Sequence, residues 1–123
     1  MNIDNIFVIN LKKDTKKKEK ITIRLNNANM LNKTTFFEAV NGTLIDNNFL
    51  KEKNITIYDK WLDPFTKRPI TKGEIGCSLS HLLIWNKIVE KNLNNVIILE
   101  DDANFNNNLL EEIKKLEIPS DYD

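Results

Sequence analysis

Residues 96–102 of this 123-residue chain read Val-Ile-Ile-Leu-Glu-Asp-Asp, an apolar run that ends in three carboxylates. Four consecutive apolar residues, three of them β-branched, are typical of a strand buried on both faces, as in parallel α/β sheets. Ligands of such sheets bind beyond the carboxyl ends of the strands, so Glu100, Asp101 and Asp102 are predicted to lie at a site. Because side chains alternate along a strand, Glu100 and Asp102 should point one way and Asp101 the other.

Two interpretations of these carboxylates stay open. As oxygen ligands they suit a hard divalent cation, Mg²⁺ or Mn²⁺, that carries a phosphorylated substrate. Alternatively, they only stabilise the start of the short helix that the apolar residues of 108–116 predict.

Two further segments of the chain have the length and composition of strands. Residues 5–11 form an apolar run, and residues 34–40 form a second run that ends at Asn41-Gly42, a turn signal. With a helix between them, this alternation predicts an α/β fold with a mainly parallel sheet flanked by helices, in one domain over residues 1–123.

The segment between the first two predicted strands is strongly basic over residues 12–20. Asp14 and Thr15 are candidate caps of a helix, and its apolar face carries Ile21, Leu25 and Ala28. The lysines either form a solvated helix face or attract a phosphate-bearing ligand toward the end of the first strand.

The middle of the chain predicts less regular structure. Residues 44–53 favour a short helix and residues 55–58 a short extended piece, followed by a surface loop over residues 59–70. Trp61 and Phe65 are interpreted as anchors of this loop in the core, with sugar stacking as the alternative.

Thr71-Lys72-Gly73-Glu74 has the pattern of a capping box and predicts a helix that runs to about Glu90. Only a short loop separates this helix from the strand at 96–102, so the two should be antiparallel and the helix should begin at the edge where the carboxylates lie. Gly73 and Gly76 suggest that another group approaches the helix backbone closely, or only that they ease packing. The residues predicted to face the core are Ile75, Leu79, Leu82, Leu83, Ile88 and Val89.

His81, the single histidine, follows Cys77 by one helical turn. This pair resembles half of a metal site, but the chain has no further Cys or His to complete it. His81 is therefore either a buried, hydrogen-bonded residue or a substrate contact. Ser80 has no base beside it for nucleophilic chemistry.

The composition excludes several classes of protein. Eighteen basic and eighteen acidic residues give a net charge of zero, which provides no electrostatic basis for a nucleic-acid partner. The chain contains no apolar run as long as a membrane span and no signal-peptide pattern, so we expect a cytoplasmic protein. Cys77 is the single cysteine, which excludes an internal disulfide.

Three stretches of the chain together carry a resemblance. They are Phe7-Val8-Ile9-Asn10-Leu11 before the basic segment, Gly73-Glu74-Ile75-Gly76-Cys77-Ser78-Leu79-Ser80-His81 with Trp85 after it, and Ile98-Leu99-Glu100-Asp101-Asp102. In this order and spacing they resemble glycosyltransferase family 25, which contains bacterial lipooligosaccharide glycosyltransferases and collagen hydroxylysine galactosyltransferases. The middle stretch is the specific one, and Phe37-Glu38-Ala39-Val40-Asn41-Gly42 also resembles the end of the family's second strand.

The resemblance implies a GT-A-like, Rossmann-type fold and transfer of a sugar from a nucleotide-diphospho-sugar, a UDP-hexose. The acceptor would be a saccharide, another glycan or a collagen-like hydroxylysine. Glu100, Asp101 and Asp102 stand where such enzymes carry an Asp-x-Asp element. By this resemblance Asp102 ligates Mn²⁺ or Mg²⁺ on the diphosphate, and Glu100 assists the metal or contacts the ribose.

The resemblance also assigns contacts to the substrates. Asn10, Leu11 and Gly42 would border the nucleotide base, while Glu74 and His81 would contact the donor or the acceptor. Glu100 and Asp101 also belong to the predicted substrate-binding residues.

Members of the family continue for about as long again after Tyr122-Asp123, so the resemblance covers only their N-terminal half. The acceptor-side half and the general base would then be missing, and no catalytic residue is assigned. The alternative is a non-catalytic remnant that binds sugar nucleotides, or an interaction domain.

Overall fold

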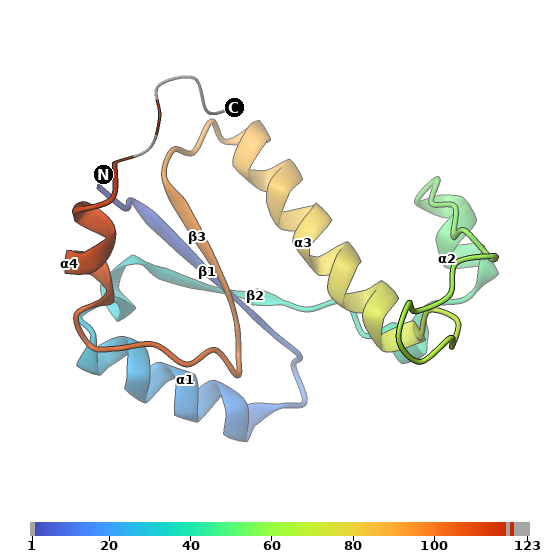
Figure 1. Cartoon of the computed structure of the whole chain (residues 1–123), viewed down its shortest axis with the longest axis horizontal. Coiled ribbons are helices and arrows are strands. Elements are labelled where there is room, and N and C mark those ends of the chain that lie inside the picture. The colour runs from blue at the N-terminus through green and yellow to red at the C-terminus, as the bar shows by residue number, and fades with distance from the viewer. Residues whose placement is uncertain (1, 118, 120–123) are drawn as a thin grey trace.

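The computed structural model describes residues 2–117 and 119 and contains a three-stranded parallel sheet (Figure 1). The strands are β1 (Asn5–Asn10), β2 (Thr34–Glu38) and β3 (Val96–Glu100), in the order β2-β1-β3. β1 is the central strand, and its Val8 lies opposite Phe36 of β2 and Leu99 of β3. The predicted α/β fold and parallel sheet are confirmed. In the family that the chain resembles, another strand of the sheet normally starts at the position of Tyr122-Asp123, which lies outside the described residues.

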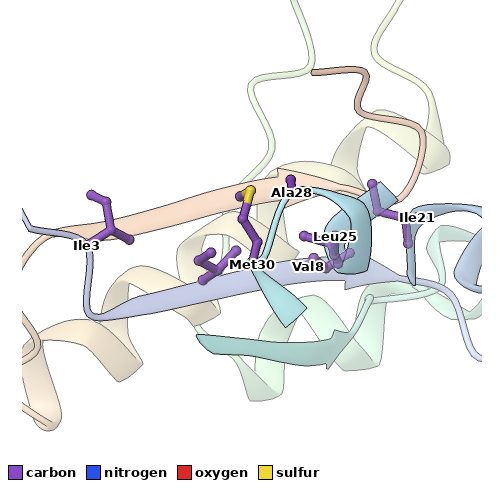
Figure 2. Packing of buried hydrophobic residues seen from close by; sticks show 7 residues of the cluster. Ile3, Val8, Ile21, Leu25, Ala28 and Met30 are labelled. Carbon is purple, nitrogen blue, oxygen red and sulfur yellow. The ribbon is translucent and has the colours of Figure 1, made fainter. Parts of the chain in front are cut away.

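Helices α1 (Thr15–Asn27) and α4 (Leu109–Lys114) cover one face of the sheet. Ile21 and Leu25 of α1 are fully buried, and Figure 2 shows them beside Val8 of β1. This confirms the predicted apolar face of α1. Asp14 occupies the N-cap position, but its side chain makes no capping hydrogen bond.

Helix α3 (Lys72–Glu90) covers the opposite face of the sheet (Figure 1). Its fully buried apolar residue is Ile84, which packs with Phe7 and Ile9 of β1. The predictions for Leu79 and Ile88 are confirmed, because Leu79 is buried and Ile88 packs against the same cluster. The prediction that Leu82, Leu83 and Val89 face the core is wrong, because all three are exposed. The buried line follows Gly76, Ser80 and Ile84 at a spacing of four residues. Two of these residues are too small or too polar to appear in a hydrophobic pattern.

The segment between β2 and α3 contains α2 (Asn47–Glu52) and a long loop, which lie beyond the start of α3 (Figure 1). Residues 55–58 do not form a strand. Trp61 is 39% exposed and Phe65 is 92% exposed, so the prediction that they anchor the loop in the core is wrong. Asp63 orders the loop instead, because its carboxylate accepts hydrogen bonds from the amides of Phe65 and Thr66 and from the Thr66 hydroxyl.

Within residues 2–117 and 119, no helix combines the length and the apolar character needed to cross a lipid bilayer.

Candidate functional site

A cavity of about 310 Å³ opens at the carboxyl ends of the three strands. Leu11 follows β1, Gly42 follows β2, and Glu100 and Asp101 stand at the end of β3. The first turns of α3 close one side through Cys77. The structure thus brings together, at the edge where parallel α/β sheets bind ligands, segments that are far apart in the sequence.

The carboxylates after β3 separate to opposite sides of the sheet. Asp101 faces α1, where its carboxylate accepts a 2.8 Å hydrogen bond from the Asn10 amide and lies 3.5 Å from the Lys17 ammonium. The negative charge of Asp101 raises the pKa of Lys17. Glu100 faces α3 instead. The predicted alternation of Glu100 and Asp101 is therefore confirmed. Asn10 is buried and absent from the cavity lining, so its contact with the nucleotide base stays a prediction.

Asp102 belongs to the turn after β3, so strand alternation does not fix its direction. Its side chain is exposed, it is absent from the cavity lining, and it makes no side-chain hydrogen bond with another residue of 2–117 or 119. Its charge nevertheless contributes to raising the pKa values of both Lys17 and Cys77. Asp102 therefore adds negative potential on both sides of the edge, and its role as a metal ligand stays a prediction.

Glu100 meets Cys77 and His81 of α3. Its Oε1 lies 3.4 Å from the Cys77 Sγ and 3.4 Å from the His81 Nε2. Partial burial, and then the neighbouring Glu100 carboxylate, raise the pKa of the Cys77 thiol. The His81 side chain is 29% exposed, so the interpretation that His81 is a buried residue is wrong, and its role as a substrate contact stays a prediction. The sequence analysis considered only Cys and His as further ligands, so it did not predict Glu100 as the third member of this group.

Glu74 has a structural role at the start of α3. Its carboxylate accepts hydrogen bonds from the amide and hydroxyl of Thr71, which confirms the capping box. The same carboxylate forms a two-pronged ion pair with Arg68, with both N···O distances 2.8 Å. The hydrogen bonds from Arg68, which have the largest effect, and those from Thr71 lower the pKa of Glu74 to about 2. Glu74 is not part of the cavity lining, and its contact with substrate stays a prediction.

The depressed pKa of Glu74 predicts a pH dependence of stability. Its folded value of about 2 lies below the ordinary 4.5, so its contribution is present above pH 4.5 and is lost as the pH falls toward 2. Glu74→Gln should be less stable than the wild type at neutral pH, and this difference should shrink through that window. Urea denaturation across the range measures it. Arg68→Gln should keep part of the dependence, because the Thr71 donors remain; a difference independent of pH would contradict the assignment.

Two glycines let α3 approach the loop after β2. A Cβ on Gly76 would lie 2.6 Å from the Val40 carbonyl oxygen, and a Cβ on Gly42 would overlap the carbonyl of Lys72. The interpretation of close backbone approach is thus confirmed for Gly76. For Gly73 it is not, since a Cβ there would meet only the Thr71 hydroxyl at 3.9 Å.

Ser80 also takes part in the contact between α3 and the loop after β2. The sequence analysis did not predict this structural role. Ser80 is fully buried, accepts a 2.9 Å hydrogen bond from the Val40 amide and donates to the Gly76 carbonyl. Its alignment with Gly76, one turn earlier on the helix, was the available signal. The contact fixes residues 40–43 as one wall of the cavity.

The lysines of the basic segment form a solvated helix face, and their attraction of a phosphate-bearing ligand stays a prediction. Their side chains are exposed. Lys13 and Lys17 also line the cavity, and Lys17 lies beside Asp101. The cavity therefore carries both cationic and anionic groups.

Comparison with known proteins adds an independent observation. The sequence model of glycosyltransferase family 25 (LPS biosynthesis protein) matches residues 3–121. The human protein procollagen galactosyltransferase 2 is 33% identical over 116 residues, which cover 94% of this chain and 18% of that protein.

Two other relatives show a similar extent of match. A glycosyltransferase 25 family member of Aedes aegypti is 38% identical over 106 residues, covering 85% of this chain and 17% of that protein. A rat protein named probable inactive glycosyltransferase 25 family member 3 is 32% identical over 116 residues, which cover 94% of this chain and 20% of that protein. The chain thus spans about a fifth of the length of these curated relatives. Because the family match extends over nearly all of its residues, the chain belongs to glycosyltransferase family 25.

Proposed function

We propose that this chain binds a nucleotide-diphospho-sugar, a UDP-hexose, at the carboxyl edge of a GT-A-type sheet. The sugar would be transferred to a saccharide or to a hydroxylysine-type, collagen-like acceptor. The observation that carries the proposal is the cavity of about 310 Å³ at this edge, where Lys13 and Lys17 accompany Glu100 and Asp101. Its volume lies within the range of small-molecule sites.

The charges around the cavity match the chemistry of such a donor. Lys13 and Lys17 provide ammonium groups for the diphosphate. Asp101, held by Asn10 and beside Lys17, can accept hydrogen bonds from hydroxyl groups and fixes the position of the lysine. Leu11 and Gly42 line the cavity where the nucleotide base would lie.

A divalent cation, Mn²⁺ or Mg²⁺, belongs to the proposal. Asp102 is its proposed ligand, and Glu100 assists the metal or contacts the ribose. Carboxylate oxygens are the donors that these hard cations prefer. The side chain of Asp102 has no hydrogen bond with the part of the chain that the structure describes, so coordination there breaks none. Such a cation, when bound, stabilises the negative charge that develops on the departing diphosphate.

The second candidate is a non-catalytic protein that binds sugar nucleotides. It is supported by the name of the rat relative, which describes that protein as probably inactive. Both candidates share donor binding and differ in transfer. An interaction domain without a donor site is the remaining alternative.

Asp102→Asn tests the donor site. UDP-galactose or UDP-glucose is titrated calorimetrically into the wild type with and without Mn²⁺. We expect binding that Mn²⁺ strengthens, and loss of most of this Mn²⁺ effect in Asp102→Asn, roughly tenfold or more in affinity. Glu90→Gln, a carboxylate change at the far end of α3, should retain it.

The outcomes separate the candidates. Hexose transfer to a saccharide or a hydroxylysine peptide supports the transferase, and donor binding without transfer supports the non-catalytic protein. Equal Mn²⁺ effects in Asp102→Asn and the wild type would refute the metal role of Asp102. No UDP-sugar binding at all would leave the interaction domain.

A further inference from the structure

Cys77, His81 and Glu100 place three metal-ligating atoms close together on the α3 side of the sheet edge. The thiol sulfur, one imidazole nitrogen and one carboxylate oxygen all lie within 4.8 Å of one another. Cys77 and His81 are one turn apart on α3, and Glu100 ends β3, so two rigid elements hold the group. We propose that these residues form a site for a borderline transition-metal cation, Zn²⁺ or Co²⁺. This site shares Glu100 with the proposed Mn²⁺ or Mg²⁺ site, but its other ligands are Cys77 and His81 instead of Asp102.

The two distances from Glu100 to its partners in the trio fit a bound cation. With zinc–ligand bonds of about 2.0 to 2.3 Å and tetrahedral angles, neighbouring ligand atoms are about 3.3 to 3.6 Å apart. The Glu100 oxygen lies 3.4 Å from both the sulfur and the nitrogen. An N···O distance of 3.4 Å is longer than the usual 2.7 to 3.2 Å of a direct hydrogen bond. The Cys77 sulfur and the His81 nitrogen lie within 4.8 Å of each other, so side-chain rotation that brings them to about 3.6 Å completes the geometry.

The donor types decide which metal the site prefers. A thiolate and an imidazole favour Zn²⁺, Co²⁺ and related cations, whereas Mg²⁺ and Mn²⁺ favour oxygen. A thiolate and a carboxylate together balance the two charges of the cation, and Asp102 adds negative potential nearby.

The surroundings of the trio resemble those of zinc sites that retain an open position. Cys77 and Glu100 both line the cavity, while the ring of Trp85 lies 6.2 Å from that of His81 on the side of α3. Three protein ligands beside a cavity leave a fourth position for water or for an oxygen of a bound molecule. Binding of the cation does not depend on the proposed sugar donor.

Cobalt spectroscopy tests this site directly, because Cys77 and His81 are the only cysteine and histidine of the chain. The reduced, metal-free 123-residue protein is titrated with Co²⁺ without oxygen. We expect one Co²⁺ per chain, with a thiolate-to-cobalt charge-transfer band that Zn²⁺ bleaches. Cys77→Ser should abolish the band. Loss of second-shell partners alone typically weakens metal binding 10–100-fold, so His81→Gln and Glu100→Gln should weaken Zn²⁺ binding on the order of 100-fold.

Two controls make the result specific. Ser78 is next to Cys77, but its hydroxyl donates a hydrogen bond to the Glu74 carbonyl of the same helix. Ser78→Ala should therefore leave the band unchanged. Asp102→Asn should also retain the band, although it should lose the Mn²⁺ effect on UDP-sugar binding, so the two proposals can fail independently. No thiolate band in the wild type, one cobalt shared by two chains, or unchanged Zn²⁺ affinity in His81→Gln and Glu100→Gln would overturn the trio as a metal site.

Discussion

Gly42→Ala is expected to destabilise the protein by about 3 kcal/mol, because overpacking of this kind costs 1–3 kcal/mol or more. The new Cβ would overlap the Lys72 carbonyl and lie 2.9 Å from the Gly73 amide nitrogen. Both are backbone atoms in the first turn of α3, so no side chain can rotate away. The whole loop or the helix must move instead. Relative to a typical total stability of 5–15 kcal/mol, this is a large loss.

Thermal and urea denaturation measure this effect, and two other glycines calibrate it. Gly73→Ala places a methyl group where only the Thr71 hydroxyl is near, so better helix propensity should stabilise by up to about 1 kcal/mol. Gly76→Ala should fall between them, since its clash with the Val40 carbonyl is partly offset by the same gain. If Gly42→Ala proved as stable as the wild type, α3 and residues 40–43 would not be in close contact.

Ile84→Ala is expected to cost about 3 kcal/mol through a different mechanism. Ile84 is fully buried between α3 and the sheet, against Phe7 and Ile9. Removing its outer carbons loses their burial and leaves a cavity, and changes of this type cost 2–5 kcal/mol. Since α3 carries Cys77 and His81, loosening this contact should also weaken metal binding at the proposed trio.

Leu83→Ala is the matched control for Ile84→Ala. Leu83 is the adjacent residue and is 42% exposed, so its truncation should cost less than about 1 kcal/mol. Urea denaturation of both variants gives the comparison. A larger cost for Leu83→Ala than for Ile84→Ala would mean that α3 presents to the sheet the face predicted from hydrophobicity alone.

Local chemistry made much of the fold predictable. β1 and β3 are short apolar runs, and the start of α3 is encoded by Thr71 and Glu74, whose side chains satisfy amides within the same helical turn. The short connection from α3 to β3 then requires an antiparallel pair. These features depend on residues close together in the sequence, so they could be predicted without knowledge of the whole molecule.

The site was predictable only in outline. The position of Glu100 and Asp101 at the sheet edge followed from the strand pattern, and so did their opposite directions. The partners of each acid did not follow, because they come from α1 and α3. The exposure of Trp61 and Phe65 was also missed, since hydrophobicity alone does not say whether a loop reaches the core.

The sequence by itself determined the parallel α/β frame, the family and the acidic edge of the sheet. Only the tertiary structure decided that α3 turns Gly76, Ser80 and Ile84 inward, and that Glu100 meets Cys77 and His81. The physical reason is that capping and strand formation depend on neighbouring residues. The rotation of a helix depends on how its backbone packs against a distant loop, where small residues give no hydrophobic signal.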